Sequence, residues 1–292
     1  MTNADDLRSG KTHRDENFPV ASWLIKPRHR APILAFYEFV RTADDIADHP
    51  RLPAQQKLEL LDSLEADLVG GDGDNAQALA LRTALDNHGL SPQHPLDILK
   101  AFRLDVTKRR YTDWNDLMGY CAYSAMPVGR FVLDVHNESR ATWSASDSLC
   151  AALQIINHLQ DCGNDYRNLD RVYVPLDALE AAGVAVESLG EPHASPPLRR
   201  CLNGLAERTA TLLGPAEVLT TSTVDWRLGM EIAIIHRLAQ RLTRLLATHD
   251  PLSEGTHLGK LDVVSVSLVA VMQGTAHRLR RRKRAPSGLS ST

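Results

Sequence analysis

The chain has 292 residues, of which 43% are hydrophobic and 24% charged, and its formal net charge is −3. This length and composition suit one large globular domain, and the small net charge argues against nucleic acid as the main partner. Aromatic residues make up only 5% of the chain, which disfavours a β-sandwich, because strands prefer aromatic and β-branched residues. The four cysteines lack metal-type spacing and the polar N-terminus does not resemble a signal peptide, so we expect a reduced, cytoplasmic protein.

Hydrophobic periodicity predicts helices along almost the whole chain. Glycine-rich and proline-containing loops at 70–73 and 89–92 interrupt the pattern. Strand-like alternation never persists, although 171–175 is a short extended candidate. The sequence therefore predicts a single all-α domain with a central cavity between its helices. The predicted helices cover residues 29–48, 54–69, 76–88, 93–110, 113–126, 128–137, 145–164, 196–213, 225–248 and 260–280.

The two ends of the chain differ from its middle. Residues 1–15 are polar, so we expect a flexible N-terminus, and we assign 16–277 to the folded domain. The tail 278–292 begins with six positive charges within the run from Arg278 to Arg284. Two interpretations of this tail stay open: a solvated flexible end, or a peripheral contact with the anionic inner face of a membrane. The uncharged run 263–276 is shorter than the roughly 20 apolar residues that span a bilayer.

The first predicted helix carries an acidic stripe. Tyr37, Arg41, Asp44 and Asp48 fall on one face of this helix, and Asp45 lies at the edge of the stripe. Aspartate is a mediocre helix former and like charges repel, so three aspartates within five positions need a compensating cation.

A second stripe lies on the predicted helix 145–164. Gln154, Asn157, Asp161 and Asp165 follow one another at intervals of three, four and four residues, among apolar neighbours. Buried carboxylates are costly unless they are paired or bind metal. Each stripe alone is compatible with a solvated face, but two facing stripes predict an oxygen-rich Mg²⁺ site, with Arg41 as a positive partner for a diphosphate.

These motifs resemble those of a known family. The pattern Arg-x-x-Asp-Asp-x-x-Asp at 41–48 and the second stripe resemble the two aspartate-rich motifs of squalene and phytoene synthases. Between them, residues 120–129 match the Tyr-x-x-x-x-Ala-x-x-Val-Gly helix of that family. The resemblance spans roughly residues 16–180 and implies the all-α isoprenoid synthase fold.

Three further segments, 16–22, 124–130 and 165–175, resemble the bacterial hydroxysqualene synthases of the hopanoid pathway. That resemblance implies conversion of presqualene diphosphate and water to hydroxysqualene and diphosphate, with Mg²⁺ and without NADPH. It also implies a prenyl diphosphate lipid as substrate and leaves open a hand-over with other squalene-pathway enzymes. Two alternatives remain: a squalene or presqualene diphosphate synthase acting on two farnesyl diphosphates, and a non-catalytic relative of the same fold.

The resemblance also implies roles for individual residues. Tyr120 matches an active-site tyrosine, which either orients water or relays a proton, or serves as a hydrogen-bonded wall. Two positions depart from the squalene and phytoene synthases, which join two prenyl diphosphates: Glu16 and Gln160 stand where these enzymes often have basic residues. We interpret this loss of positive charge as suiting a substrate with one diphosphate. The implied magnesium ligands are Asp44, Asp48, Asn157, Asp161 and Asp165. The implied substrate-binding residues are Phe18, Tyr37, Arg41, Tyr120, Ser124, Gln154, Asn157, Arg171 and Tyr173.

Overall fold

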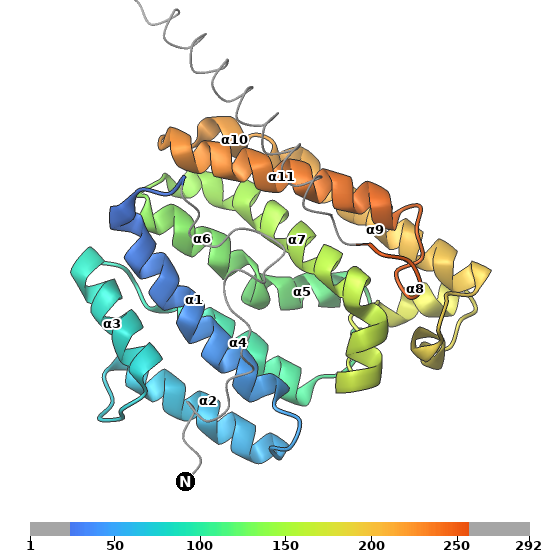
Figure 1. The fold of residues 1–292 in the computed structure, drawn as a ribbon, viewed down its shortest axis with the longest axis horizontal. Helices are drawn as coiled ribbons and strands as arrows, with labels where there is room; N and C mark the ends of the chain where they lie inside the picture. The colour runs from blue at the N-terminus through green and yellow to red at the C-terminus, as the bar shows by residue number, and fades with distance from the viewer. Residues whose placement is uncertain (1–23, 257–292) are drawn as a thin grey trace, which may run out of the picture.

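The computed structural model describes residues 24–256, which form an assembly of α-helices (Figure 1). Helix α7 runs through the middle and packs against α6, α9 and α11, while α1 packs against α3, α4 and α2. Helix α6 contacts both α1 and α7. The α-helices are α1 (Pro27–Asp48), α2 (Ala54–Val69), α3 (Ala76–His88), α4 (Gln93–Thr107), α5 (Trp114–Ser124), α6 (Met126–Val135), α7 (Trp143–Asn164), α8 (Leu176–Ala181), α9 (Pro196–Ala216), α10 (Leu219–Ser222) and α11 (Trp226–Leu246).

The predicted all-α architecture is confirmed, and local sequence signals account for several helix ends. Pro27 occupies the first turn of α1, where its missing N–H costs nothing. The Asn75 side chain caps α3 by accepting a hydrogen bond from the Ala78 N–H at 2.9 Å. Helix α2 ends at Gly70, whose φ of 115° is a left-handed conformation that favours glycine.

The predicted helix 93–110 was too long, because α4 ends at Thr107. The chain is extended at Lys108, and the Arg109 carbonyl accepts a hydrogen bond from Val172 N–H at 2.9 Å. The extended candidate 171–175 therefore pairs with the extended segment that follows α4, through a bridge between Arg110 and Val172, a contact that periodicity does not reveal. The short helices α8 and α10 were missed, and the predicted helix 260–280 lies outside the described residues.

Buried apolar side chains form two clusters. One cluster lies among α1, α2, α3, α4 and α6, and it contains Phe39, Leu61 and Phe131. The other surrounds α7 and contains Ile156 and Leu202. Among the described helices, none is long and apolar enough to cross a lipid bilayer.

Gly129 lets α6 approach α7 closely. A Cβ atom at this position would overlap the side chains of Ser146 and Cys150. This contact gives a physical reason for the glycine of the Val-Gly motif, since a larger side chain would have to displace Ser146 and Cys150 where the two helices meet.

Candidate active site

A cavity of about 430 Å³ lies between α1, α4, α5, α7 and the segment that follows α7. Each implied site residue within the described part of the chain lines it, from elements far apart in the sequence. These residues are Tyr37, Arg41, Asp44, Asp48, Tyr120, Ser124, Gln154, Asn157, Asp161, Asp165, Arg171 and Tyr173. Phe18 and Glu16 lie outside the described residues.

The aspartates gather at the C-terminal ends of two helices. Asp48 is the last residue of α1, and Asp165 follows the last residue of α7 and begins the π-helical turn η3 (Asp165–Leu169). A helix C-terminus carries partial negative charge, which disfavours carboxylates within the last turn. Bringing two such ends to one cavity concentrates negative potential there, and a bound cation would offset it.

Arg41 holds part of this charge in place. Its Nη1 lies 2.6 Å from Asp44 Oδ2, and its Nη2 lies 2.8 Å from Asp45 Oδ1. Burial, reinforced by the Asp48 carboxylate, raises the pKa of Asp44 to about 7 despite the opposing charge of Arg41. The Asp44 side chain nevertheless stays 35% accessible, so it is open to a ligand in the cavity.

Arg171 ties the segment after α7 to α1 and α4. Its Nη1 donates to Asp48 Oδ1 at 2.6 Å, and its Nη2 donates to the Ala47 carbonyl at 3.2 Å. Its Nε donates to the Asp105 carbonyl at 3.0 Å. The guanidinium group therefore closes one side of the cavity.

Asp105 of α4 is a site residue that the sequence analysis missed. Its carboxylate accepts hydrogen bonds from the hydroxyls of Tyr120, at 2.9 Å, and Tyr173, at 2.7 Å. Burial raises the pKa of Asp105, against the nearby charge of Arg171. Burial and the Asp105 carboxylate raise the pKa values of both tyrosines, so their hydroxyls stay protonated and donate. A signal was present, because Asp105 follows Ile98 and Ala101 on the buried face of α4.

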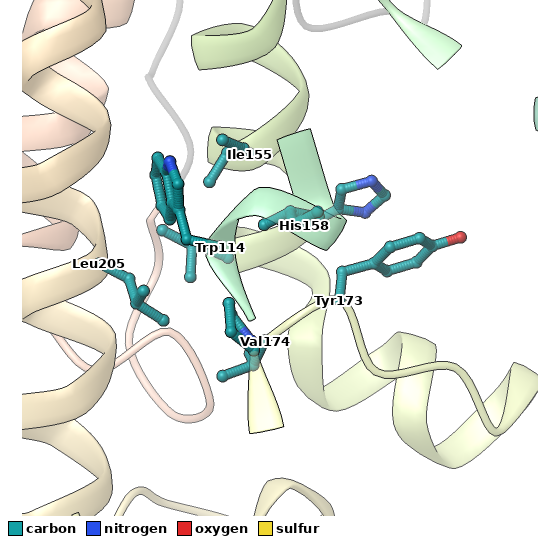
Figure 2. A pocket seen from close by; sticks show the side chains of 9 residues that line it. Trp114, Ile155, His158, Tyr173, Val174 and Leu205 are labelled. Atoms are coloured by element: carbon teal, nitrogen blue, oxygen red, sulfur yellow. The ribbon is translucent and has the colours of Figure 1, made fainter. Parts of the chain in front are cut away.

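His158 forms part of the cavity wall together with Tyr173. Their ring centroids lie 3.5 Å apart at an interplanar angle of 15°. Figure 2 shows both rings pointing away from Trp114 and Leu205, which line a small pocket behind them. That pocket has a volume of about 10 Å³, so it holds at most about one water molecule. The stacked pair thus separates the polar cavity from the packed interior.

A second cavity, of about 310 Å³, continues from the first. Tyr37, Val40 and Val128 line both. Most of its other lining residues are apolar side chains of α1, α6, α7 and α11, including Ile33 and Leu153. The two cavities together suit a ligand with an anionic head and a long apolar body.

Gln160 is buried next to Asp161 in the sequence but does not line either cavity. Its side-chain amide donates to the Thr256 carbonyl at 2.5 Å. The interpretation that a neutral residue at this position lowers the charge at the substrate therefore gains no support from its placement.

The oxygen-bearing side chains of the two stripes fit Mg²⁺. Mg²⁺ prefers carboxylate, amide and water oxygens and is commonly held by a few carboxylates together with substrate phosphates. Four aspartates and Asn157 line the same cavity, and burial, reinforced by the Asp48 carboxylate, raises the pKa of Asp44.

Residues 11–262 match the family model described as squalene/phytoene synthase. The chain belongs to the squalene/phytoene synthase family. Three relatives in this family are named hydroxysqualene synthase. That of Rhodopseudomonas palustris is 59% identical over 278 residues, covering 95% of each chain. That of Sinorhizobium fredii is 52% identical with the same coverage, and that of Zymomonas mobilis is 49% identical over 92% of this chain and 91% of its own.

Solved structures of the family share the fold. A squalene synthase from Alicyclobacillus acidocaldarius aligns with a TM-score of 0.67 and 25% identity, covering 88% of each chain. A dehydrosqualene synthase aligns with a TM-score of 0.78 and 21% identity, over 90% of this chain and 93% of its own. The expected isoprenoid synthase fold is thereby confirmed.

Proposed function

We propose that this protein is a hydroxysqualene synthase, which converts presqualene diphosphate and water to hydroxysqualene and diphosphate. The observation that carries the proposal is the joined pair of cavities, with carboxylates from α1 and α7 at one end and apolar walls at the other. The identities of 49–59% to relatives named hydroxysqualene synthase, over nearly the whole chain, support the same reaction.

Asp44, Asp48, Asn157, Asp161 and Asp165 are the proposed Mg²⁺ ligands. Bound Mg²⁺ would supply positive charge to the diphosphate as it leaves. Arg41 and Arg171 offset part of the carboxylate charge at the two helix ends, and bound Mg²⁺ would offset more of it.

The protein side chains then have three tasks. Arg41 and Gln154 lie beside the carboxylates and would bind and orient the diphosphate. As the carbon–oxygen bond breaks, the Tyr37 ring at the junction of the cavities, together with Phe18, would stabilise the cyclopropylcarbinyl cation. The apolar wall keeps bulk water from this cation until it has rearranged, after which one water adds and loses a proton.

Tyr120 keeps the two roles that the sequence left open. Its hydroxyl donates to Asp105, so it can serve as a rigid wall, and a water that donates to its oxygen would be oriented by the same contact. Changing Tyr120 to Phe separates the roles. Loss of hydroxylated product with continued diphosphate release favours water orientation, whereas an unchanged product favours the wall.

Product analysis tests the reaction. Purified protein with Mg²⁺ is given presqualene diphosphate or farnesyl diphosphate in separate tubes, without NADPH, and the products are identified by mass spectrometry. Hydroxysqualene from the first tube and nothing from the second is the expected result. Presqualene diphosphate or squalene from farnesyl diphosphate would instead identify a condensing synthase.

We also propose that the protein is cytoplasmic and contacts the inner membrane face through the basic run 278–284, which lies outside the described residues. The proposal rests on the charge of the run and on the lipid nature of the proposed substrate. Co-sedimentation with anionic vesicles should fall when residues 278–292 are removed. Unchanged co-sedimentation would point to another contact surface. Direct hand-over of lipid from other squalene-pathway enzymes would be consistent with such a location.

A further inference from the structure

A cluster of two histidines and one aspartate lies at the opposite end of α1 from the carboxylates. His29 is in the first turn of α1, His136 follows α6, and Asp225 precedes α11. One potential ligand atom from each residue lies within 4.8 Å of the others. We propose that these three residues form a binding site for a divalent transition-metal ion such as Zn²⁺, which braces α1, α6 and α11 against one another. This site is separate from the proposed Mg²⁺ site and does not depend on the proposed reaction.

The donor types favour a transition metal over Mg²⁺. Imidazole nitrogen suits Zn²⁺, Co²⁺ and Ni²⁺, whereas Mg²⁺ takes oxygen ligands. Zinc bonds to nitrogen and oxygen are about 2.0–2.2 Å long, so tetrahedral ligands lie roughly 3.4 Å apart. The observed upper limit of 4.8 Å therefore needs only small side-chain rotations to close around an ion.

Each histidine has one ring nitrogen that carries no proton in its neutral form. His136 Nδ1 lies 2.8 Å from the Val132 carbonyl, which can only accept, so Nδ1 carries the proton and Nε2 is free of one in the neutral ring. This arrangement is typical of histidine ligands, whose second nitrogen donates to a carbonyl. His29 Nε2 accepts from Arg28 Nε at 3.0 Å and likewise carries no proton.

Burial favours the uncharged form of both rings. Their centroids lie 4.2 Å apart, and His29 is only 5% exposed. Burial, together with the neighbouring His136, lowers the pKa of His29 to about 4, and burial lowers the pKa of His136. A metal ion would therefore not have to displace charge-bearing protons at neutral pH.

Two side-chain cations contact two of the proposed ligands and would compete with a metal ion for them. Lys26 Nζ lies 2.8 Å from Asp225 Oδ2, and Arg28 contacts His29. Arg28 is exposed and the Lys26 side chain is 36% accessible, so both can move into solvent. Glu138 holds the turn before α11 by accepting hydrogen bonds from the N–H groups of Val224, at 2.8 Å, and Asp225, at 2.7 Å. Asp225 is therefore fixed near the histidines.

The test uses the full chain without a histidine tag, stripped by chelator and kept in excess Mg²⁺ to occupy the carboxylates. Co²⁺ is titrated by visible absorption, and bound metal is counted by elemental analysis. We expect one Co²⁺ per chain, displaced by Zn²⁺, and a rise in Tm of roughly 5–10 °C at about a hundredfold excess of Zn²⁺ over Kd.

Matched variants assign the ion to the cluster. His29→Gln and His136→Gln should lose the Co²⁺, while His193→Gln, at an exposed loop histidine, should keep it. Asp225→Asn preserves the cap of α11, since Asn caps a helix as well as Asp. This variant should bind Co²⁺ at least about tenfold more weakly than wild type. Lys26→Gln should bind Co²⁺ more tightly than wild type, because the ammonium group that competes for the Asp225 carboxylate is gone.

Asp225→Asn and Lys26→Gln should shift the Kd for Co²⁺ in opposite directions. The test therefore stays decisive even if a histidine variant does not fold. A wild-type chain that takes up no Co²⁺ or Zn²⁺ in excess Mg²⁺ would overturn the proposal. So would unchanged Kd values in Asp225→Asn and Lys26→Gln.

Discussion

The two ends of the joined cavity differ in what their residues contribute. At the apolar end, α1 and α7 present residues such as Ile33 and Leu153, whose burial is favourable. At the polar end, the same two helices present aspartates at their C-termini, where burial and the helix dipole both oppose them. The first end resembles a domain core, and the second is retained at a cost in stability. This contrast indicates that the polar end is kept for ligand binding.

The largest effect should come from neutralising one carboxylate of the polar end. Asp161→Asn or Asp44→Asn should lower kcat roughly a thousandfold or more, since metal clamps supply several kcal/mol to a leaving group. Steady-state assays with presqualene diphosphate measure this loss. Asp74→Asn makes the same charge change on an exposed loop and should leave kcat unchanged. Full activity in either site variant would remove the metal assignment.

Substitutions of Asp105 test whether residues at the polar end of the cavity also stabilise the fold. Asp105→Ala leaves the buried hydroxyls of Tyr120 and Tyr173 without their acceptor, which should destabilise the protein by about 2–4 kcal/mol. Thermal unfolding should show the loss. Asp105→Asn retains an acceptor oxygen and should recover most of the stability. Equal Tm values for wild type and the Ala variant would show that water replaces the carboxylate.

At the apolar end, Gly129→Ala should destabilise the protein by about 1–3 kcal/mol, because the new methyl overlaps Ser146 and Cys150. Gly119 offers a matched control, since a Cβ added there meets open space on helix α5. Gly119→Ala should therefore stabilise by roughly 0.4–1 kcal/mol. Chemical denaturation measures the free energy of unfolding of both variants. A change of the same sign in both would contradict the proposed overlap at Gly129.

The smallest expected effect is a pH dependence at the far end of α1. His29 has its pKa lowered from 6.5 to about 4 by burial, by His136 and by Arg28, with Asp225 opposing and Lys26 reinforcing the shift. The unfolded chain therefore takes up the proton first. Stability from this group should be complete above pH 6.5 and should decrease as the pH falls toward 4.

Thermal unfolding in chelator measures this dependence. His29→Gln should have a shallower decline of Tm than wild type between these pH values. Parallel declines in the two proteins would show that other groups dominate acid unfolding.

Much of the fold followed from the sequence, because helix periodicity is a local property. Helices α2 and α3 begin and end at the predicted residues. The two acidic stripes were likewise visible, since side chains three and four residues apart share a helix face. The resemblance supplied Tyr120, Arg171 and Tyr173, whose positions in the cavity no local pattern reveals.

The residues that were missed depend on contacts between distant segments. Asp105 meets Tyr173 across 68 positions of the chain. His29, His136 and Asp225 come from three elements that are separated by about a hundred residues each. Periodicity on one helix carries no information about such encounters. For Asp105 and His29, a polar side chain on the buried face of a helix was a signal, whereas His136 and Asp225 lie at helix ends, outside such a pattern.

Arg171 has a consequence for how the protein folds. It joins Asp48, 123 residues earlier, and the carbonyl of Asp105, 66 residues earlier. Contacts of such long sequence separation require closure of large loops, which slows folding. The polar end of the cavity therefore exists only once these distant segments have come together. A fragment that carries one acidic stripe without the other should have no partial activity.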